Sequence, residues 1–309
     1  MSAAPALPRT LRVIVRDWLN ANQAVLADAE SCVVIDSGYV RDAARTLALL
    51  DAPGMLDRRR IDLLVNTLCH SDHMGGNAAL ARAHRCRIGV PQGEAPLIRR
   101  WDERELWLSY ADQRCERFTP DDELQAGARY RWGGLDWLAV AAPGHDMHAL
   151  MFWCERHGVL ISGDALWEHG FGLLLPGPDR RERLESTRAT LDTIAALAPR
   201  VVVPGHGRPF GDVDAALARA RARLAALAED ELRMVRAVLK TMFMFTLLER
   251  EAMARDALPD YFARTGLYAD LNRDYFGLPA ARLADLVVDE LQRAGAVELA
   301  GGVLRPRTG

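Results

Sequence analysis

Short apolar runs alternate with amphipathic stretches over the first two thirds of the chain. The runs are bounded by Gly, Pro, Asn or Asp and have the length and β-branched content of buried strands. They are LRVIV (11–15), QAVLAD (23–28), SCVVIDSG (31–38), IDLLVNT (61–67), CRIGVP (86–91), RYRWGG (129–134), LDWLAVAAPG (135–144), ALMFWCE (149–155), GVLISGDAL (158–166) and RVVVPGHG (200–207). Helical spacing in 40–52 and 75–85 falls between them. The pattern predicts an α/β domain with two sheet halves, each with helices, up to about residue 210.

One stretch interrupts this alternation. Residues 98–118, IRRWDERELWLSYADQRCERF, are rich in Trp and Arg, and we predict a helix there. The interpretation we favour is a solvated helix that only packs on the domain. The alternative is a helical insert near the functional site, since inserts at strand ends commonly supply substrate contacts.

From about Val213 the pattern becomes helical. Residues 213–239 predict a long Ala/Arg/Leu-rich helix, and residues 281–306 predict an amphipathic helix followed by two short strands around Gly301 and Gly302. A helix followed by a hairpin is typical of a winged helix. We therefore predict an α/β domain at 1–212 and a mostly helical, winged-helix-like domain at 213–309. Such modules often bind nucleic acid, but no Lys/Arg stripe marks the final helix, which favours packing or homodimer formation.

The C-terminal part is unusually apolar for a small solvated module. MFMFTLLER (242–250), YFARTGLY (261–268) and NRDYFG (272–277) carry most of this surface. We expect it to be buried against the first domain or a second subunit, where Tyr261, Phe262 or Tyr275 would help to shape a substrate pocket.

Composition narrows the class of protein. The 309 residues are 50% hydrophobic and carry a formal net charge of -3, which gives no bulk attraction to nucleic acid or anionic lipid. The five cysteines are scattered and odd in number, as expected for reduced thiols. The N-terminus lacks a basic segment followed by an apolar run, and no apolar stretch of about 18 residues occurs. We expect a cytoplasmic protein that does not span a membrane.

Candidate metal ligands cluster at the ends of predicted strands. The clusters are HSDH with His70, Asp72 and His73, PGHDMH with His145, SGDALW with Asp164, and VPGHG with His206. Strand ends project side chains beyond a sheet, where separate segments can converge on one ion. Imidazoles and carboxylates suit zinc, manganese or iron and permit activation of a bound water.

The order and flanks of these clusters resemble the metallo-β-lactamase fold superfamily. Members have a Thr-His-x-His-x-Asp-His loop, then a His near Pro-Gly-His, an Asp near Gly-Asp and a last His in Gly-His. The positions filled here are Thr67, His70, Asp72, His73, His145, Asp164 and His206, and VVIDSG resembles the family's early strand ending at Asp36 and Gly38. The match spans residues 10 to 210 approximately, and it implies an αββα sandwich with a dinuclear site at one edge.

GDALWEHGFG and the helical extension are similar to a narrower branch of this superfamily. That branch contains hydrolases related to lactamase-β-like protein 2, and some of its members are reported to be ribonucleases.

The resemblance implies an unequal pair of metal sites. One metal takes a His at position 68, His70 and His145, the other takes Asp72, His73 and His206, and Asp164 bridges both. Position 68 is Leu here, so the first site lacks one ligand. We expect a divalent metal, zinc first and iron or manganese as alternatives, with one tight ion and a second weaker one.

Two residues close to position 68 are candidates to replace the missing ligand of the first site. In an extended segment, the side chain of Cys69 points away from the face that positions 68 and 70 share. This orientation favours a buried structural thiol. His148 is the better candidate to complete the first site or to touch substrate.

Three classes of function follow. The first is a metal-dependent hydrolase of a small ester, thioester or lactone, in which Asp72 orients the water and His148 or backbone N–H groups polarise the carbonyl. Trp101 and Trp107 would wall an apolar pocket, with Tyr261 from the C-terminal part. The alternatives are an endoribonuclease or phosphodiesterase, and a binding protein with a degraded site.

Overall fold

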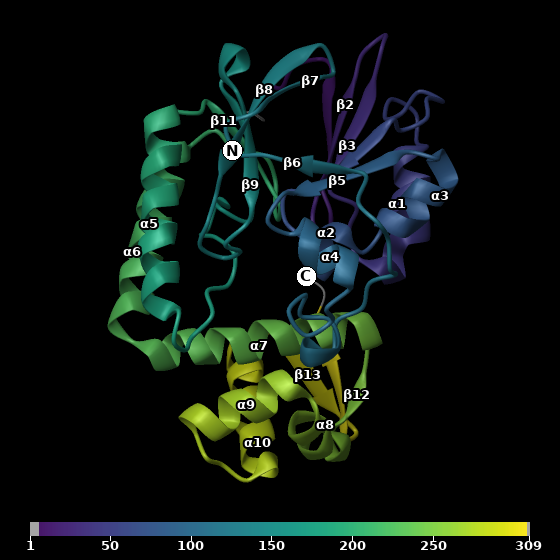
Figure 1. Ribbon diagram of the computed structural model, residues 1–309. Coiled ribbons are helices and arrows are strands. Elements are labelled where there is room, and N and C mark those ends of the chain that lie inside the picture. The colour runs from purple at the N-terminus through teal and green to yellow at the C-terminus, as the bar shows by residue number, and fades with distance from the viewer. Residues whose placement is uncertain (1–5, 308–309) are drawn as a thin grey trace.

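Two β-sheets lie between two layers of helices in the first part of the chain (Figure 1). The computed structural model describes residues 6–307. One sheet has the order β1 (Leu11–Ile14), β2 (Gln23–Ala27), β3 (Cys32–Ile35), β4 (Leu63–Val65), β5 (Arg87–Pro91) and β6 (Asp122–Leu124). The other has the order β11 (Val201–Pro204), β10 (Val159–Gly163), β9 (Leu150–Cys154), β8 (Leu135–Ala141) and β7 (Arg129–Trp132). Each predicted strand of the first 210 residues is confirmed.

The helices cover the outer faces of the sheets. α1 (Ala43–Leu50) and α3 (Asn77–His84) lie beside the first sheet, and α5 (Arg180–Leu197) and α6 (Val213–Glu229) cover the second (Figure 1). Between the sheets, Val33 and Ile35 of β3 share a core with Phe152 of β9 and Ile161 of β10. The predicted αββα sandwich is confirmed.

The strands that carry the candidate ligands end at one edge. β3, β4, β5 and β6 run parallel to one another, and β10 runs parallel to β11. The carboxyl ends of parallel strands lie on the same side of a sheet. Leu150 N donates to Thr67 O at 2.8 Å and Asn22 N donates to Gly205 O at 2.7 Å, so hydrogen bonds join the two sheets at this edge.

The helix predicted over 98–118 is wrong. The segment holds only the end of α4 (Ala95–Arg100) and the 3-10 turn η2 (Ser109–Ala111). Trp101 has φ 57° and Trp107 has φ 59°, which is incompatible with a right-handed helix. The Asp102 carboxylate accepts hydrogen bonds from Arg104 N and Glu105 N, which favours a turn over helix continuation.

The long helix predicted over 213–239 is two helices. Asp230 is extended (φ -134°, ψ 103°), and its side chain accepts a hydrogen bond from Arg233 N. This arrangement begins α7 (Glu231–Arg250). The chain therefore turns away from α6 before the apolar stretch at 242–250 begins.

The remaining C-terminal elements pack below α7 (Figure 1). They are β12 (Met253–Ala254), η4 (Arg255–Ala257), α8 (Leu258–Arg264), α9 (Gly266–Tyr275), α10 (Ala280–Arg293), β13 (Val297–Ala300) and β14 (Val303–Pro306). Gly301 (φ 58°) and Gly302 (φ 77°) form the turn of the β13–β14 hairpin, as predicted. A mostly helical C-terminal part is thus confirmed, whereas its description as winged-helix-like stays a prediction.

Near the start of α7, the chain passes from the hydrophobic core of the first part to that of the C-terminal part. α6 buries Leu217 and Leu224 in the same cluster as Leu191 and Ile194 of α5. From Val235 onward, α7 contributes instead to the C-terminal cluster. A domain boundary between residues 212 and 213 stays a prediction. α6, which begins at Val213, packs with α5 of the first domain.

The end of α7 is tied to the first domain by a buried carboxylate. Tyr39 Oη donates to Glu249 Oε2 at 2.9 Å, and Arg114 Nε lies 2.7 Å from Glu249 Oε1. Arg250 adds an ion pair with Asp112 at 2.6 Å. α7 is therefore held against the edge where the candidate ligands lie. Within residues 6–307, none of the helices combines the length and apolarity needed to cross a membrane.

Two truncations test where the packing boundary lies. We expect a chain ending at residue 230 to retain more structure than one ending at 212, because only the longer chain keeps the apolar face of α6. Each buried Leu of that face contributes about 1.5–3 kcal/mol. Both truncations should be less soluble than the full chain, since both lose α7. Thermal melts followed by circular dichroism provide the measurement, and equal melting temperatures for the two truncations would contradict the assignment of α6.

Candidate metal centre

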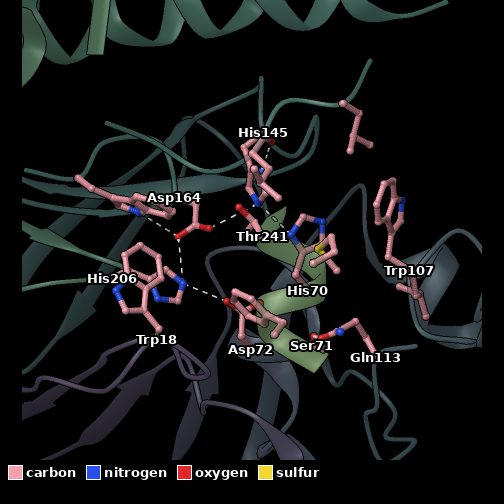
Figure 2. A pocket seen from close by; sticks show the side chains of 16 residues that line it. Trp18, His70, Ser71, Asp72, Trp107, Gln113, His145, Asp164, His206 and Thr241 are labelled. Carbon is pink, nitrogen blue, oxygen red and sulfur yellow. Dashed lines mark hydrogen bonds and ion pairs between the residues drawn. The ribbon is translucent and has the colours of Figure 1, made fainter. Parts of the chain in front are cut away.

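The six candidate ligands converge at the shared sheet edge. Figure 2 labels His70, Asp72, His145, Asp164 and His206. His70, Asp72 and His73 lie in and beside the short helix α2 (Ser71–Met74), which follows β4. His145 comes from the β8–β9 loop, and Asp164 and His206 follow β10 and β11.

Two glycines allow this close approach. A Cβ at Gly205 would overlap Asp164 Oδ1, and a Cβ at Gly172 would overlap the His145 ring.

One set of ligands is complete and buried. Asp72, His73 and His206 each offer an atom within 4.8 Å of the others. His206 Nε2 lies 2.9 Å from Asp72 Oδ2, and His73 Nε2 lies 3.3 Å from Asp164 Oδ1. Two imidazoles and two carboxylates therefore face one point, which is the donor set expected for a divalent transition metal.

Asp36 determines which nitrogen of His73 faces this point. His73 Nδ1 lies 2.9 Å from Asp36 Oδ2, and Asp36 also accepts hydrogen bonds from Thr67 N (2.9 Å) and Thr67 Oγ1 (2.8 Å). With Nδ1–H donating to Asp36, Nε2 is the nitrogen that faces Asp164 and that would carry the lone pair for a bound metal. Nε2 is buried and has no hydrogen-bond partner, an arrangement that a metal ion would satisfy. The sequence placed Asp36 at a strand end, but this role was missed.

The carboxylates and imidazoles of this set shift one another's pKa values. Burial acts to lower the pKa of His73, but the nearby Asp36, Asp164 and Asp72 carboxylates outweigh it and hold that pKa well above its ordinary value. Burial acts to raise the pKa of Asp72 and of Asp164, but His73 and His206 lower both. The carboxylates are thus ionised at neutral pH, as metal ligands must be.

The second set is smaller. His70 Nδ1 lies 2.9 Å from His145 Nε2, which lies 3.4 Å from Asp164 Oδ2. Asp164 thus presents Oδ1 to the complete set and Oδ2 to this one. Burial, followed by the neighbouring His145, lowers the pKa of His70 to about 4, so its imidazole is neutral near pH 7. Two imidazoles and one carboxylate remain for a metal here.

Leu68 and Cys69 lie in different apolar clusters. Leu68 is 1% exposed and belongs to the cluster that contains Met151, Leu166 and Phe171. Cys69 packs on the opposite side in the cluster of α2 and β5, where burial raises its pKa well above the ordinary value for a thiol. A buried, protonated Cys69 agrees with the prediction of a structural thiol.

Two carboxyl groups lie behind His70. Its Nε2 is 3.6 Å from Asp146 Oδ2, and the Glu94 carboxyl is buried next to Asp146. Burial, followed by Asp146, raises the pKa of Glu94 to about 9, so Glu94 is protonated at neutral pH. Such partners orient a ligating imidazole. The positions of Asp146 and Glu94 behind His70 have no signal in the sequence pattern.

His148 does not point to the centre. Its side chain packs against Gly93, at the position that a Cβ would occupy, and the residue is exposed. Its backbone N donates to Asp146 Oδ1 at 2.7 Å. The structure therefore leaves His148 outside the pocket, and its predicted catalytic role has no contact to support it.

A pocket opens over the ligands and encloses roughly 720 Å³, part of it open to solvent. It is lined by Trp18, His70, Ser71, Asp72, Leu106, Trp107, Gln113, His145, Asp164, Trp167, Leu173, Leu175, His206, Thr241, Met242 and Phe245 (Figure 2).

Of the three predicted substrate contacts, Trp107 lines this pocket, whereas Trp101 and Tyr261 do not. Trp101 packs edge-on against Phe118 at 5.9 Å between ring centroids. Tyr261 is buried in the C-terminal core and hydrogen-bonds to Thr246 (2.9 Å) and Asp112 (3.1 Å).

Two indoles that the sequence analysis missed flank the complete ligand set. Trp18 stacks on His206 with 5.3 Å between ring centroids, and Trp167 Nε1 donates to Asp164 Oδ1 at 3.2 Å. Trp18 is nevertheless 56% exposed. Contact between Trp18 and His206 depends on chain segments far apart in sequence, so local pattern gives no signal for it.

Comparison with known proteins agrees with this geometry. The family model of the metallo-beta-lactamase superfamily matches residues 16–206. A hydroxyacylglutathione hydrolase of Bdellovibrio bacteriovorus is 26% identical over 182 residues, which is 55% of this chain and 63% of that protein. The acyl-coenzyme A thioesterase MBLAC2 of Gallus gallus is 26% identical over 210 residues, 62% of this chain and 74% of that protein.

The structural similarity extends over the C-terminal part. A beta-lactamase domain protein from Burkholderia ambifaria has a TM-score of 0.60 at 22% identity, covering 98% of this chain and 94% of the other. Matches to curated relatives are shorter and span between 44% and 74% of those proteins' lengths. Because the family model covers well over half of the sequence, the chain belongs to the metallo-beta-lactamase superfamily.

Proposed function

We propose that this protein is a metal-dependent hydrolase of a small thioester or ester. The observation that carries the proposal is the buried, unpartnered Nε2 of His73, which faces Asp72, Asp164 and His206 at the base of an apolar pocket. Such a pocket with a few convergent polar groups is typical of a small-molecule site. The named relatives hydrolyse thioesters, which supports this class of substrate over a phosphodiester.

The metal would be held unequally. Asp72, His73 and His206 with Asp164 provide a full donor set, whereas His70 and His145 share Asp164 without a fourth protein ligand. We infer one tight divalent ion, zinc first and iron or manganese as alternatives, and a second, weaker ion. When bound, such an ion acts as a Lewis acid and brings the pKa of a coordinated water toward about 7.

The chain's own residues orient the reactants. Asp72 would accept a hydrogen bond from the attacking water and take up the proton that the water loses as its oxygen bonds to the carbonyl carbon. The C–S or C–O bond then breaks, and the leaving thiolate or alkoxide receives that proton. Apolar walls, including Leu106, Trp107 and Leu173, exclude other water and strengthen these interactions.

Metal content tests the proposal directly. Replacing His73 or His206 with Ala should abolish tight binding, because each change removes one of two imidazoles from the complete set. Elemental analysis of purified protein should find one ion or more per wild-type chain and less than a tenth of that in either variant. The matched control is His169→Ala, since His169 is exposed and lies outside the pocket.

Substrate panels separate the classes of function. Thioesters, esters, lactones and phosphodiesters are assayed with the metal-loaded wild type and His73→Ala. We expect thioester or ester hydrolysis that His73→Ala reduces by at least a thousandfold. Phosphodiester cleavage alone would favour the nuclease, and a loaded protein without hydrolytic activity would favour a binding protein.

Leu68→His tests the incomplete set. If position 68 lies on the face of His70, the new imidazole should increase occupancy by the second ion. The substitution also places a polar ring in an apolar cluster, so we expect the metal-free variant to lose about 1–3 kcal/mol of unfolding free energy. Metal titration followed by calorimetry measures both effects. Unchanged stoichiometry in a folded variant would show that Leu68 does not occupy a ligand position.

A further inference from the structure

We propose that the pocket selects an uncharged, apolar acyl group, bound between α7 and the segment containing Leu106 and Trp107. The proposal rests on the proposed thioester or ester hydrolase. It adds the substrate class, which the geometry of α7 and the distribution of charge around the pocket indicate.

α7 is apolar on two faces. One face buries Val238, Leu239, Phe243 and Leu247 in the C-terminal core. The other carries Thr241, Met242 and Phe245, which line the pocket in front of the ligands. The C-terminal core covers the first of these faces, and the second faces the pocket, where an apolar ligand would cover it.

The facing wall is equally apolar. Leu106 and Trp107 come from the irregular segment after α4, and Leu173 and Leu175 come from the loop between β10 and α5 (Figure 2 labels Trp107). These side chains and those of α7 provide contacts for a flexible hydrocarbon chain. Two of the neutral polar groups in the lining are already paired, because Ser71 Oγ donates to Gln113 Oε1 at 3.0 Å.

The charged groups lie only at the metal end. Among the lining residues of the described chain, the ionisable side chains are His70, Asp72, His145, Asp164 and His206, and Lys and Arg are absent. Carboxylates and phosphates of a substrate are usually held by Arg or Lys. An anionic group placed against the apolar walls of the pocket would therefore lack a basic partner.

The effect of burying a hydrocarbon chain on binding affinity can be measured. Each methylene removed from water contributes a factor of about fourfold to affinity. For N-acetylcysteamine thioesters with acetyl to octanoyl groups, we expect kcat/KM of the metal-loaded full-length enzyme to rise by roughly this factor per methylene until the chain exceeds the pocket. S-lactoylglutathione should be a poorer substrate than the octanoyl thioester by at least a hundredfold.

A matched pair of variants tests the role of α7. Met242 and Met244 both pack against the C-terminal core, but only Met242 lines the pocket. Met242→Ala and Phe245→Ala should reduce the octanoyl-to-acetyl ratio of kcat/KM by about tenfold each. Met244→Ala should leave that ratio at the wild-type value. Equal ratios in Met242→Ala and Met244→Ala would overturn the assignment.

A binding measurement separates this inference from the hydrolase itself. Neutral carboxamides from acetamide to octanamide are titrated into full-length metal-free protein, with indole fluorescence and calorimetry as readouts. Affinity that increases with chain length and weakens in Phe245→Ala supports the apolar subsite. Inactivity toward every ester and thioester would reject the hydrolase but would leave this support for the subsite unchanged. Hydrolysis without chain-length dependence, or a dependence that follows the thiol rather than the acyl group, would reject the subsite.

Discussion

The hydrogen bond between His73 and Asp36 organises the candidate metal centre. It joins β3 to α2 in the interior, and Asp36 simultaneously accepts two hydrogen bonds from Thr67 at the end of β4. His73 is completely buried, so an unpaired imidazole would carry a large desolvation cost. Asp36 satisfies one nitrogen and directs the other toward Asp164. The orientation of His73, and which of its nitrogens faces the other candidate ligands, therefore depends on this contact.

The two ligand sets at this sheet edge differ in the number of side chains that they contain. Asp164 lies between them and faces the complete set with one oxygen and the smaller set with the other. Leu68 joins the apolar core under α5 and α6. His70 contacts His145 and Asp146.

The C-terminal part contributes to the pocket through one helix. α7 shares its apolar residues between its own core and the pocket, while Glu249 ties its end to Tyr39 and Arg114. A substrate would thus contact ligands from the first domain and a wall from the second. This division places reactivity and substrate choice on separate elements, so the acyl preference can change through Met242 or Phe245 while the ligands stay intact.

The sequence by itself determined the strands, the order of the ligand clusters and the family, because strand periodicity and motif spacing are local properties of the chain. It also indicated a Gly301–Gly302 hairpin, since that turn requires positive φ at both residues. Tertiary structure decided which side chains reach the pocket. Trp18 and Met242 enter it, whereas Trp101, His148 and Tyr261 do not. Their positions depend on contacts between distant segments and on turns such as those at Trp101 and Asp230, where side-chain hydrogen bonds and positive φ override helical periodicity.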